Sequence, residues 1–302
     1  MLLWLKRGAL MAIGLGFTLG CHGAPRATFP TPAAALEHLG QQTSCSRAIE
    51  GDADLVVSSA LFNLRAKLLY MAEAPDKVRF DIYSSFGITL STLTSNGQNF
   101  ALYSLDEKRF WYGPAKTCNL QKFTRVPIPP FALVEILRGR APVLAHEPGS
   151  ARIRFKQSWF GRGHYVVTVR GAHETTEKMT FGVPPEDWNL PLSEQRLRLL
   201  SVRVKQAGEL LYKVELSDYR AAHRAESELS LEEKEMGILP QPPSGPVCET
   251  ELPGTLKFSI PGTAYSLKIE NNEVAHNPAL HAGAFTQPVP QGVVSEYSDC
   301  PQ

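Results

Sequence analysis

Apolar and polar residues alternate along most of the chain between Gly51 and Tyr219. Side chains on a strand point to opposite faces in turn, so this alternation indicates half-buried β-strands. Short turn signals such as Asn96-Gly97 separate the runs, which predicts an antiparallel meander. We expect strands within 51–57, 62–70, 78–94 (two strands and a link), 100–103, 109–113, 151–156, 164–170, 177–181, 197–205, 210–219, 256–258 and 265–269.

Two segments have helical signals instead. Thr31 to Gly40 combines a capping Thr, a Pro at the first helical position and a terminal Gly, which predicts a short helix. Val126 to Gly139 begins with three prolines and ends in Gly. Its apolar spacing at Phe131, Val134 and Leu137 predicts one amphipathic helix that covers the sheet.

A sheet with so many strands and so little helix curls or splits, because open sheets rarely exceed about ten strands. A curled sheet capped by one or two helices encloses an apolar groove, which is a shape suited to lipids. We therefore predict a mainly β (α+β) fold: a curled antiparallel sheet or incomplete β-barrel with a helical lid over an apolar cavity.

One turn of this meander is unusual. The link Ser84-Ser85-Phe86-Gly87 carries a large aromatic side chain at the tip of a tight strand connection. Loop tips are usually small and polar. Phe86 therefore either folds back on its own sheet or has a function outside it.

The N-terminus indicates export. Lys6 and Arg7 precede an apolar stretch, which ends in Gly20-Cys21. This pattern predicts a lipoprotein signal peptide over 1–20 and lipidation of Cys21; ordinary secretion with a spare Cys is the alternative. We expect a lipidated tether and short helix over 21–44. A single domain would then span 45–302, with a loop excursion near 226–246 and a C-terminal strap.

The other cysteines are Cys45, Cys118, Cys248 and Cys300. An even number in an exported chain predicts two disulfides, for which three connectivities exist. We favour Cys45–Cys118 with Cys248–Cys300, since each bond would join segments of one half of the chain. Their spacing does not fit a zinc site or a Cys-x-x-Cys redox motif.

Composition and motifs argue against several functions. The chain has 302 residues and a net charge of +1, and no basic stripe appears, so we expect no nucleic-acid partner. His173-Glu174-Thr175-Thr176-Glu177 lacks the second His of a metalloprotease motif. No Gly-x-Ser-x-Gly elbow and no phosphate loop occur. We predict no enzyme, no catalytic residue, no metal and no cofactor.

Two motifs together resemble a known family. Phe86-Gly87 in a strand–link–strand unit is followed some forty residues later by Val126-Pro127-Ile128-Pro129 and a helix that ends at Arg138-Gly139. This arrangement, behind a lipoprotein signal, resembles the LolB outer-membrane lipoprotein receptors and the wider LolA/LolB-like fold. The likeness covers roughly Gly51 to Tyr219. The family's link reads Asn-Pro-Leu-Gly, so Ser85 stands where the family has Pro.

The resemblance implies an incomplete antiparallel barrel that receives lipoprotein acyl chains and helps to insert them in the outer membrane. Ser85, Phe86, Gly87 and Ile88 would form the membrane-insertion loop. The expected cavity lining is Leu55, Val57, Phe62, Leu64, Leu68, Val78, Phe80, Ile82, Leu90, Phe100, Leu102, Trp111, Phe131, Leu133 and Leu137.

The resemblance also implies partners and a location. These are acyl chains or other lipids, the outer membrane and a periplasmic LolA-like carrier, for a monomer anchored facing the periplasm. His22 follows Cys21 where an Asp would retain a lipoprotein in the inner membrane. Two alternatives stay open: a carrier of another lipid or amphiphile, and a structural envelope lipoprotein whose own side chains fill the core.

Overall fold

The structure, a computed structural model, describes residues 25, 27–147, 149–157, 163–224, 241–247, 249–260 and 263–300. The predicted signal peptide, Cys21, Cys248 and most of the expected excursion at 226–246 lie outside these residues. Within the described ranges, no helix is both long enough and apolar enough to cross a bilayer.

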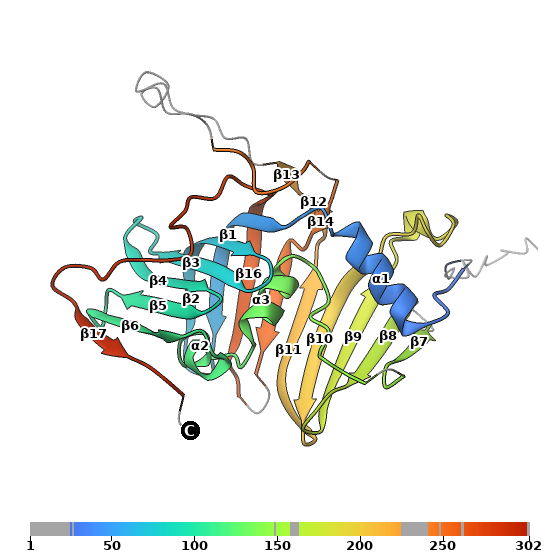
Figure 1. The fold of residues 1–302 in the computed structure, drawn as a ribbon, viewed down its shortest axis with the longest axis horizontal. Coiled ribbons are helices and arrows are strands. Elements are labelled where there is room, and N and C mark those ends of the chain that lie inside the picture. Colours follow the sequence, from blue (N-terminus) through green and yellow to red (C-terminus); the bar gives the residue numbers. More distant parts are fainter. Residues whose placement is uncertain are drawn as a thin grey trace, which may run out of the picture.

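One continuous 15-stranded sheet contains nearly every strand of the described residues (Figure 1). The chain starts in the middle of this sheet and moves outward, one antiparallel hairpin after another, to one end. These strands are β1 (Ala48–Ser58), β2 (Asn63–Glu73), β3 (Lys77–Tyr83), β4 (Thr89–Asn96), β5 (Asn99–Ser104) and β6 (Arg109–Pro114). They form the first half of the sheet.

Two helices, α2 (Thr117–Thr124) and α3 (Pro130–Leu137), then carry the chain to the opposite end of the sheet. From there a second antiparallel series returns to the middle. Its strands are β7 (Arg152–Lys156), β8 (His164–Arg170), β9 (Thr175–Gly182), β10 (Arg198–Gln206) and β11 (Glu209–Ser217). The short 3₁₀ helix η1 (Pro185–Asp187) lies between β9 and β10.

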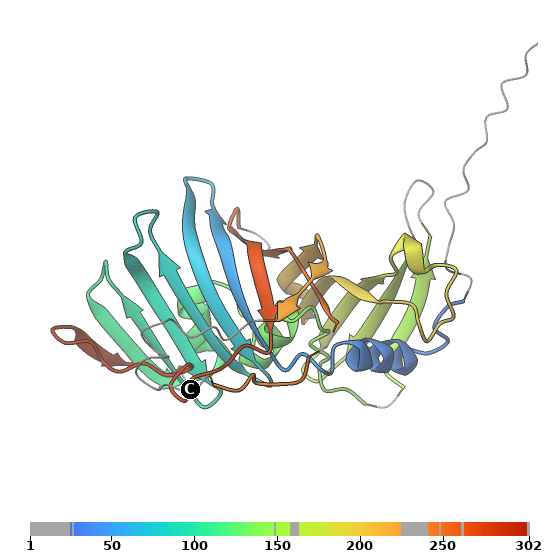
Figure 2. The same ribbon diagram turned by 90° about the horizontal axis from the view of Figure 1, so that it is seen from above.

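The gap between the two halves is filled by β15 (Thr255–Ser259) and β16 (Ser266–His276), which pair with β11 and β1 respectively. Three short strands lie nearby: β12 (Arg220–Ala221) pairs with β14 (Glu251–Leu252), and β13 (His223–Arg224) adds to β16 in parallel. The predicted mainly β fold with a curled sheet is confirmed. Figure 2 shows the curl and the hairpins of the first half standing along one edge.

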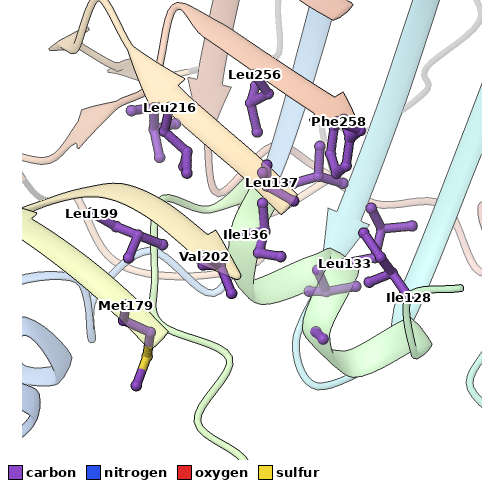
Figure 3. Packing of buried hydrophobic residues seen from close by; sticks show 14 of the residues in the cluster. Ile128, Leu133, Ile136, Leu137, Met179, Leu199, Val202, Leu216, Leu256 and Phe258 are labelled. Atoms are coloured by element: carbon purple, nitrogen blue, oxygen red, sulfur yellow. The ribbon is translucent and has the colours of Figure 1, made fainter. Parts of the chain in front are cut away.

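Helices and the core occupy the inner, concave face of the sheet. α1 (Pro32–Gln42) crosses the second half and buries Ala35 and Leu39. α3 lies where the two halves meet. Figure 3 shows Leu133, Ile136 and Leu137 of α3 among side chains of β10, β11 and β15. The second half is therefore filled by a packed core, because α1, α3 and the segment after α3 cover it.

The helix expected over 126–139 is only partly correct. The helix begins at Pro130, and 125–129 is a non-helical entry, because Pro127 and Pro129 cannot donate helical hydrogen bonds. α3 is also not amphipathic, since it is enclosed by both halves of the sheet and most of its side chains are buried. α2 was not predicted.

The favoured disulfide pairing is wrong. Cys118 in α2 is bonded to Cys300 near the C-terminus, with 5.9 Å between their Cα atoms. Cys45 is disulfide-bonded as well. The C-terminal strap does run in an extended path, and its β17 (Val294–Tyr297) adds in parallel to β6 at the edge of the first half. The bond joins residues 182 positions apart. A preference for partners within the same half of the sequence therefore could not find this pair.

Candidate functional site

A cavity of about 290 Å³ lies between the first half of the sheet and the two helices that follow it. Its sheet wall consists of apolar side chains on the inner face of β1–β6, β15 and β16. These are Leu55, Leu68, Phe80, Ile82, Leu93, Leu102, Trp111, Phe258, Leu267 and Ile269. The alternation of the strands produces this wall, because every second residue faces the same side.

The opposite wall is a lid formed by α2, the entry segment 125–129 and the start of α3. Leu120, Val126, Ile128 and Leu133 face the cavity from this side. α2 ends at Arg125, whose φ of 61° is in the left-handed region. The two prolines that follow keep the next residues extended, so their side chains can face the sheet.

The first turn of α2, the first helix of the lid, is fixed to the C-terminal strap. Besides the Cys118–Cys300 bond, the Asn119 side-chain amide donates to the carbonyl oxygens of Pro114 (2.9 Å) and Ser298 (3.1 Å). Asn119 is fully buried. The strap therefore holds α2 at one end, while the other end of α2 lies over the cavity.

One end of the cavity is polar. Ser91, Ser104, Glu107, Thr124 and Arg125 line it there, and Glu107 belongs to the β5–β6 turn. Burial raises the pKa of the nearby Tyr265 phenol, and the positive charge of Arg125 partly offsets this. An apolar interior with a polar end suits an amphiphile, whose chain and head group need different surroundings.

Two hairpins at the same edge of the sheet present apolar side chains to solvent. In the β3–β4 link, Ser84 Oγ accepts from the backbone N–H groups of Phe86 (3.3 Å) and Ile88 (3.1 Å). Gly87, with φ of 78°, completes the turn, and Phe86 is 89% exposed. The notion that Phe86 folds back on its own sheet is therefore wrong.

The β1–β2 hairpin repeats this construction. Ser59 Oγ accepts from the N–H groups of Leu61 (3.2 Å) and Phe62 (3.1 Å), and Leu61 is 93% exposed. Ile88, Phe62 and Leu64 are also largely exposed. We call the exposed apolar side chains of these two hairpins, Leu61, Phe62, Leu64, Phe86 and Ile88, the apolar rim.

The structure brings only some of the expected lining residues to the cavity. Leu55, Leu68, Phe80, Ile82, Leu102, Trp111 and Leu133 line it. Val78, Phe100 and Leu137 are buried outside the cavity, because the strands and α3 extend beyond it. Val57 is half-buried beside its strand partner Leu267.

The other expected lining residues lie outside the cavity. Phe62 and Leu64 are exposed, because the lid does not cover this end of the strands, and they belong to the apolar rim. Leu90 is exposed because a β-bulge opposite Ile82 and Tyr83 interrupts the alternation of β4. Phe131 lies on the outer side of α3 and is 38% exposed.

Sequence reasoning missed part of both walls. Leu93 was detectable, because it continues the alternation of β4 and pairs with Phe80. Leu120 had no signal, since α2 was not expected. Leu267 and Ile269 lie in a predicted strand, but nothing local places β16 next to β1.

The only carboxylate in strands β7–β10 is Glu177, which faces inward and is fully buried. Its Oε2 accepts from Leu144 N at 2.9 Å, and Oε1 has no partner within the described residues. Burial raises the pKa of Glu177 to about 7. Within the described residues, no group of three or more His, Cys, Asp or Glu side chains could hold a metal ion.

The fold and the cavity define a class: a curled β-sheet protein with a lidded apolar cavity. No family model and no curated protein matches the sequence. Among solved structures, a DUF1329 family protein from Desulfovibrio piger is similar, with a TM-score of 0.51 and 9% identity over 83% of this chain and 95% of that one.

A LolA superfamily protein from Nitrosomonas europaea is similar at a TM-score of 0.49 and 8% identity, over 85% of this chain and 98% of that one. This value lies below 0.5, so the shared fold rests on the likeness to the Desulfovibrio protein. At 9% identity it shows the fold and nothing finer. The resemblance to LolB stays a prediction.

Proposed function

We propose that this chain is a lipid-anchored envelope protein that binds an acyl chain of a lipoprotein or similar amphiphile and helps to insert it in the outer membrane. The protein would use no covalent chemistry. The mature chain would begin at Cys21, act as a monomer and face the periplasm. A LolA-like carrier is the partner that the sequence resemblance suggests.

One observation carries this proposal: the polar end of the apolar cavity lies at the same edge of the sheet as the apolar rim. Ile82 and Ser91 line the cavity. Ile82 is the second-last residue of β3 and Ser91 is the third residue of β4, the two strands that the Phe86 link joins. A chain leaving the cavity at this edge would meet a surface that favours lipid. Burying one large apolar side chain in lipid contributes about 1.5–3 kcal/mol.

The size of the cavity limits the cargo. Ligand pockets usually measure about 300–1,000 Å³, and the volume of about 290 Å³ is just below this range. One slender chain is accommodated more readily than a bulky group of chains. A larger cargo requires the lid to move.

The small volume of the cavity also favours a second candidate function, in which the protein carries another single-chain amphiphile across the periplasm. Sorting of lipoproteins distinguishes the two. Depletion of the protein should leave lipoproteins on their periplasmic carrier if it is a receptor, and correct sorting would exclude that role. A purely structural protein is disfavoured, because side chains leave the cavity open.

The cavity is tested by filling it. Ser91 lies on the inner face of β4, so Ser91→Phe would place a ring in the cavity. We expect affinity for a fluorescent fatty acid to fall about tenfold or more, which is 1.4 kcal/mol. Extraction of the purified full chain followed by mass spectrometry should release acyl lipids from the wild type and less from the variant.

Ser201→Phe is the matched control, since Ser201 faces outward on β10 away from the cavity. It should bind like the wild type. Equal binding by Ser91→Phe and the wild type, with both folded, would contradict the proposal that the cavity holds the acyl chain.

A further inference from the structure

The outer face of the second half of the sheet gathers seven cations. Arg152, Arg154 and Lys156 alternate on β7, and Arg170, Lys178, Arg203 and Lys205 come from β8, β9 and β10. The register places Arg152 opposite Thr168, Thr168 opposite Lys178, and Lys178 opposite Arg203. We call these seven residues the basic face. The expectation of no basic stripe was wrong. Arg152, Arg154 and Lys156 are close in the sequence, but the other four cations come from three further strands and join them only across the sheet.

The basic face lacks the counter-charges found elsewhere on the same side of the sheet. None of its seven cations forms an ion pair with a described residue. The outer face of the neighbouring strands shows the opposite pattern: Lys213 pairs with Glu215, Lys268 with Glu270, and Lys67 with Asp54. Glu177, the only carboxylate in β7–β10, faces inward.

Protection of the sheet edge does not explain this arrangement. Charged side chains on an edge strand such as β7 discourage pairing with other chains. Lys178 and Arg203, however, lie on interior strands, where no edge needs protection. Their direct opposition is a like-charge pair, which is unfavourable without an external anion.

The basic face also contains a hollow. It measures about 290 Å³ and is lined by five of the cations together with the hydroxyl groups of Ser150 and Thr168. Arginine and lysine around hydroxyl groups suit phosphate oxygens, which accept several charge-assisted hydrogen bonds at once.

The segment that follows the predicted tether packs against the same strands as the basic face, on their inner side. Phe29 is buried against Tyr165 of β8, with ring centroids 5.5 Å apart, and the Tyr165 hydroxyl donates to the carbonyl of Ala27 at 3.5 Å. Figure 1 shows the N-terminal end of α1 beside β7 and β8. Only five residues separate Cys21 from Ala27, and the six steps between the two span at most about 20 Å.

We propose that the basic face docks on phosphate-bearing lipid head groups of the membrane that holds the Cys21 anchor. Electrostatic attraction to a membrane falls off within a Debye length, about 8 Å at physiological salt. A short tether that ends near β7 and β8 would therefore keep the basic face within reach of the membrane. The tether argument rests on the lipidation of Cys21 in the proposed function, whereas the charge argument does not.

The full chain, purified as the producing cells make it, is placed on vesicles of phosphatidylcholine alone or of phosphatidylcholine mixed with phosphatidylglycerol. Lysine acetylation, followed by peptide mass spectrometry, then reports exposure. We expect Lys156, Lys178 and Lys205 to be protected on the anionic vesicles only. Lys257, which is exposed on β15 outside the basic face, should change less. High salt should remove the protection.

Two triple variants make the test specific. The first removes three cations of the basic face and keeps all three reporter lysines: Arg152→Gln/Arg154→Gln/Arg203→Gln. It should weaken docking about 100-fold, since each cation near an anionic membrane contributes about fivefold to the affinity. Arg65→Gln/Lys67→Gln/Lys268→Gln removes the same charge from the outer face elsewhere and should dock like the wild type. Both should fold normally, because substitutions on the surface change stability little.

The outcomes separate the possibilities. Protection on neutral vesicles, absence of protection on anionic ones, or equal weakening in both variants would overturn the inference. Protection in intact envelopes but not on anionic vesicles would also overturn it, in favour of an acidic protein partner. The mass of the N-terminal peptide reports lipidation separately, so a failed anchor and a failed basic face are distinguishable.

Discussion

Two residues on this sheet occupy environments that are unusual for their side chains. Phe86 is held in solvent by the Ser84 hydroxyl and the left-handed Gly87, whereas Glu177 is held in the core with one oxygen unpartnered. An exposed Phe and a buried carboxylate are both unfavourable for a folded chain in water alone. Each therefore has a measurable consequence when it is replaced.

Phe86→Glu should leave folding intact and impair delivery of cargo to membranes. The side chain is 89% exposed, so stability should change by less than about 0.5 kcal/mol. Loss of its burial in lipid, about 1.5–3 kcal/mol, corresponds to a roughly 10- to 100-fold slower transfer to liposomes. Val247→Glu, at a site 64% exposed outside the rim, is the control. Unchanged transfer would remove Phe86 from the mechanism.

Glu177→Gln should alter how stability depends on pH. The native pKa of Glu177 is about 7, above its ordinary 4.5, so the folded state binds more protons between these values. Wild-type stability should fall as the pH rises through this window and stay lower above it, by on the order of 3 kcal/mol at most. Urea unfolding from pH 4 to pH 8 should show a flatter profile in the variant. Parallel profiles would contradict this assignment.

The helices and the segments between them cover the two halves of the sheet differently. α2, the entry segment and α3 form a lid over the first half, whereas α1 and the chain after α3 fill the second half. The lid is fixed at the first turn of α2 by the strap and ends at the left-handed Arg125. Movement of the lid would therefore be concentrated at the end near Arg125 and the rim.

Removal of the Cys118–Cys300 bond should loosen this lid. Cys118→Ser/Cys300→Ser should lower the free energy of unfolding by about 2–4 kcal/mol, because the bond closes a long loop in the unfolded chain. The variant should also release a bound fluorescent fatty acid faster, since Leu120 and Thr124 of α2 line the cavity. Stopped-flow release and denaturant unfolding measure the two effects. An unchanged release rate would show that α2 does not limit exit.

At the scale of the whole molecule, the two halves of one sheet carry two different surfaces. Its first half encloses the cavity and carries the apolar rim, and its second half has a filled core and carries the basic face on its outer side. β15 and β16 join the halves into one curled sheet. Apolar and basic surfaces on one continuous sheet are consistent with a protein that works at a lipid–water boundary.

Much of the fold and part of the cavity could be predicted from the local pattern of apolar and polar residues. The two-residue period of side chains gave the strands of both halves, and the turn residues gave their hairpins, because both depend on neighbours in the chain. The inner-face positions of Leu55, Leu68 and Phe80 followed from the same period. Phe86 was identifiable because an aromatic residue at a tight link has no local explanation.

The remaining features depend on which distant segments meet. The pairing of β16 with β1 puts Leu267 and Ile269 in the cavity wall, and the return of the strap pairs Cys300 with Cys118. The basic face exists only once four strands are in register. The period of a strand determines which face a residue occupies; only the tertiary structure decides what lies opposite that face, whether a lid, a core, a disulfide partner or solvent.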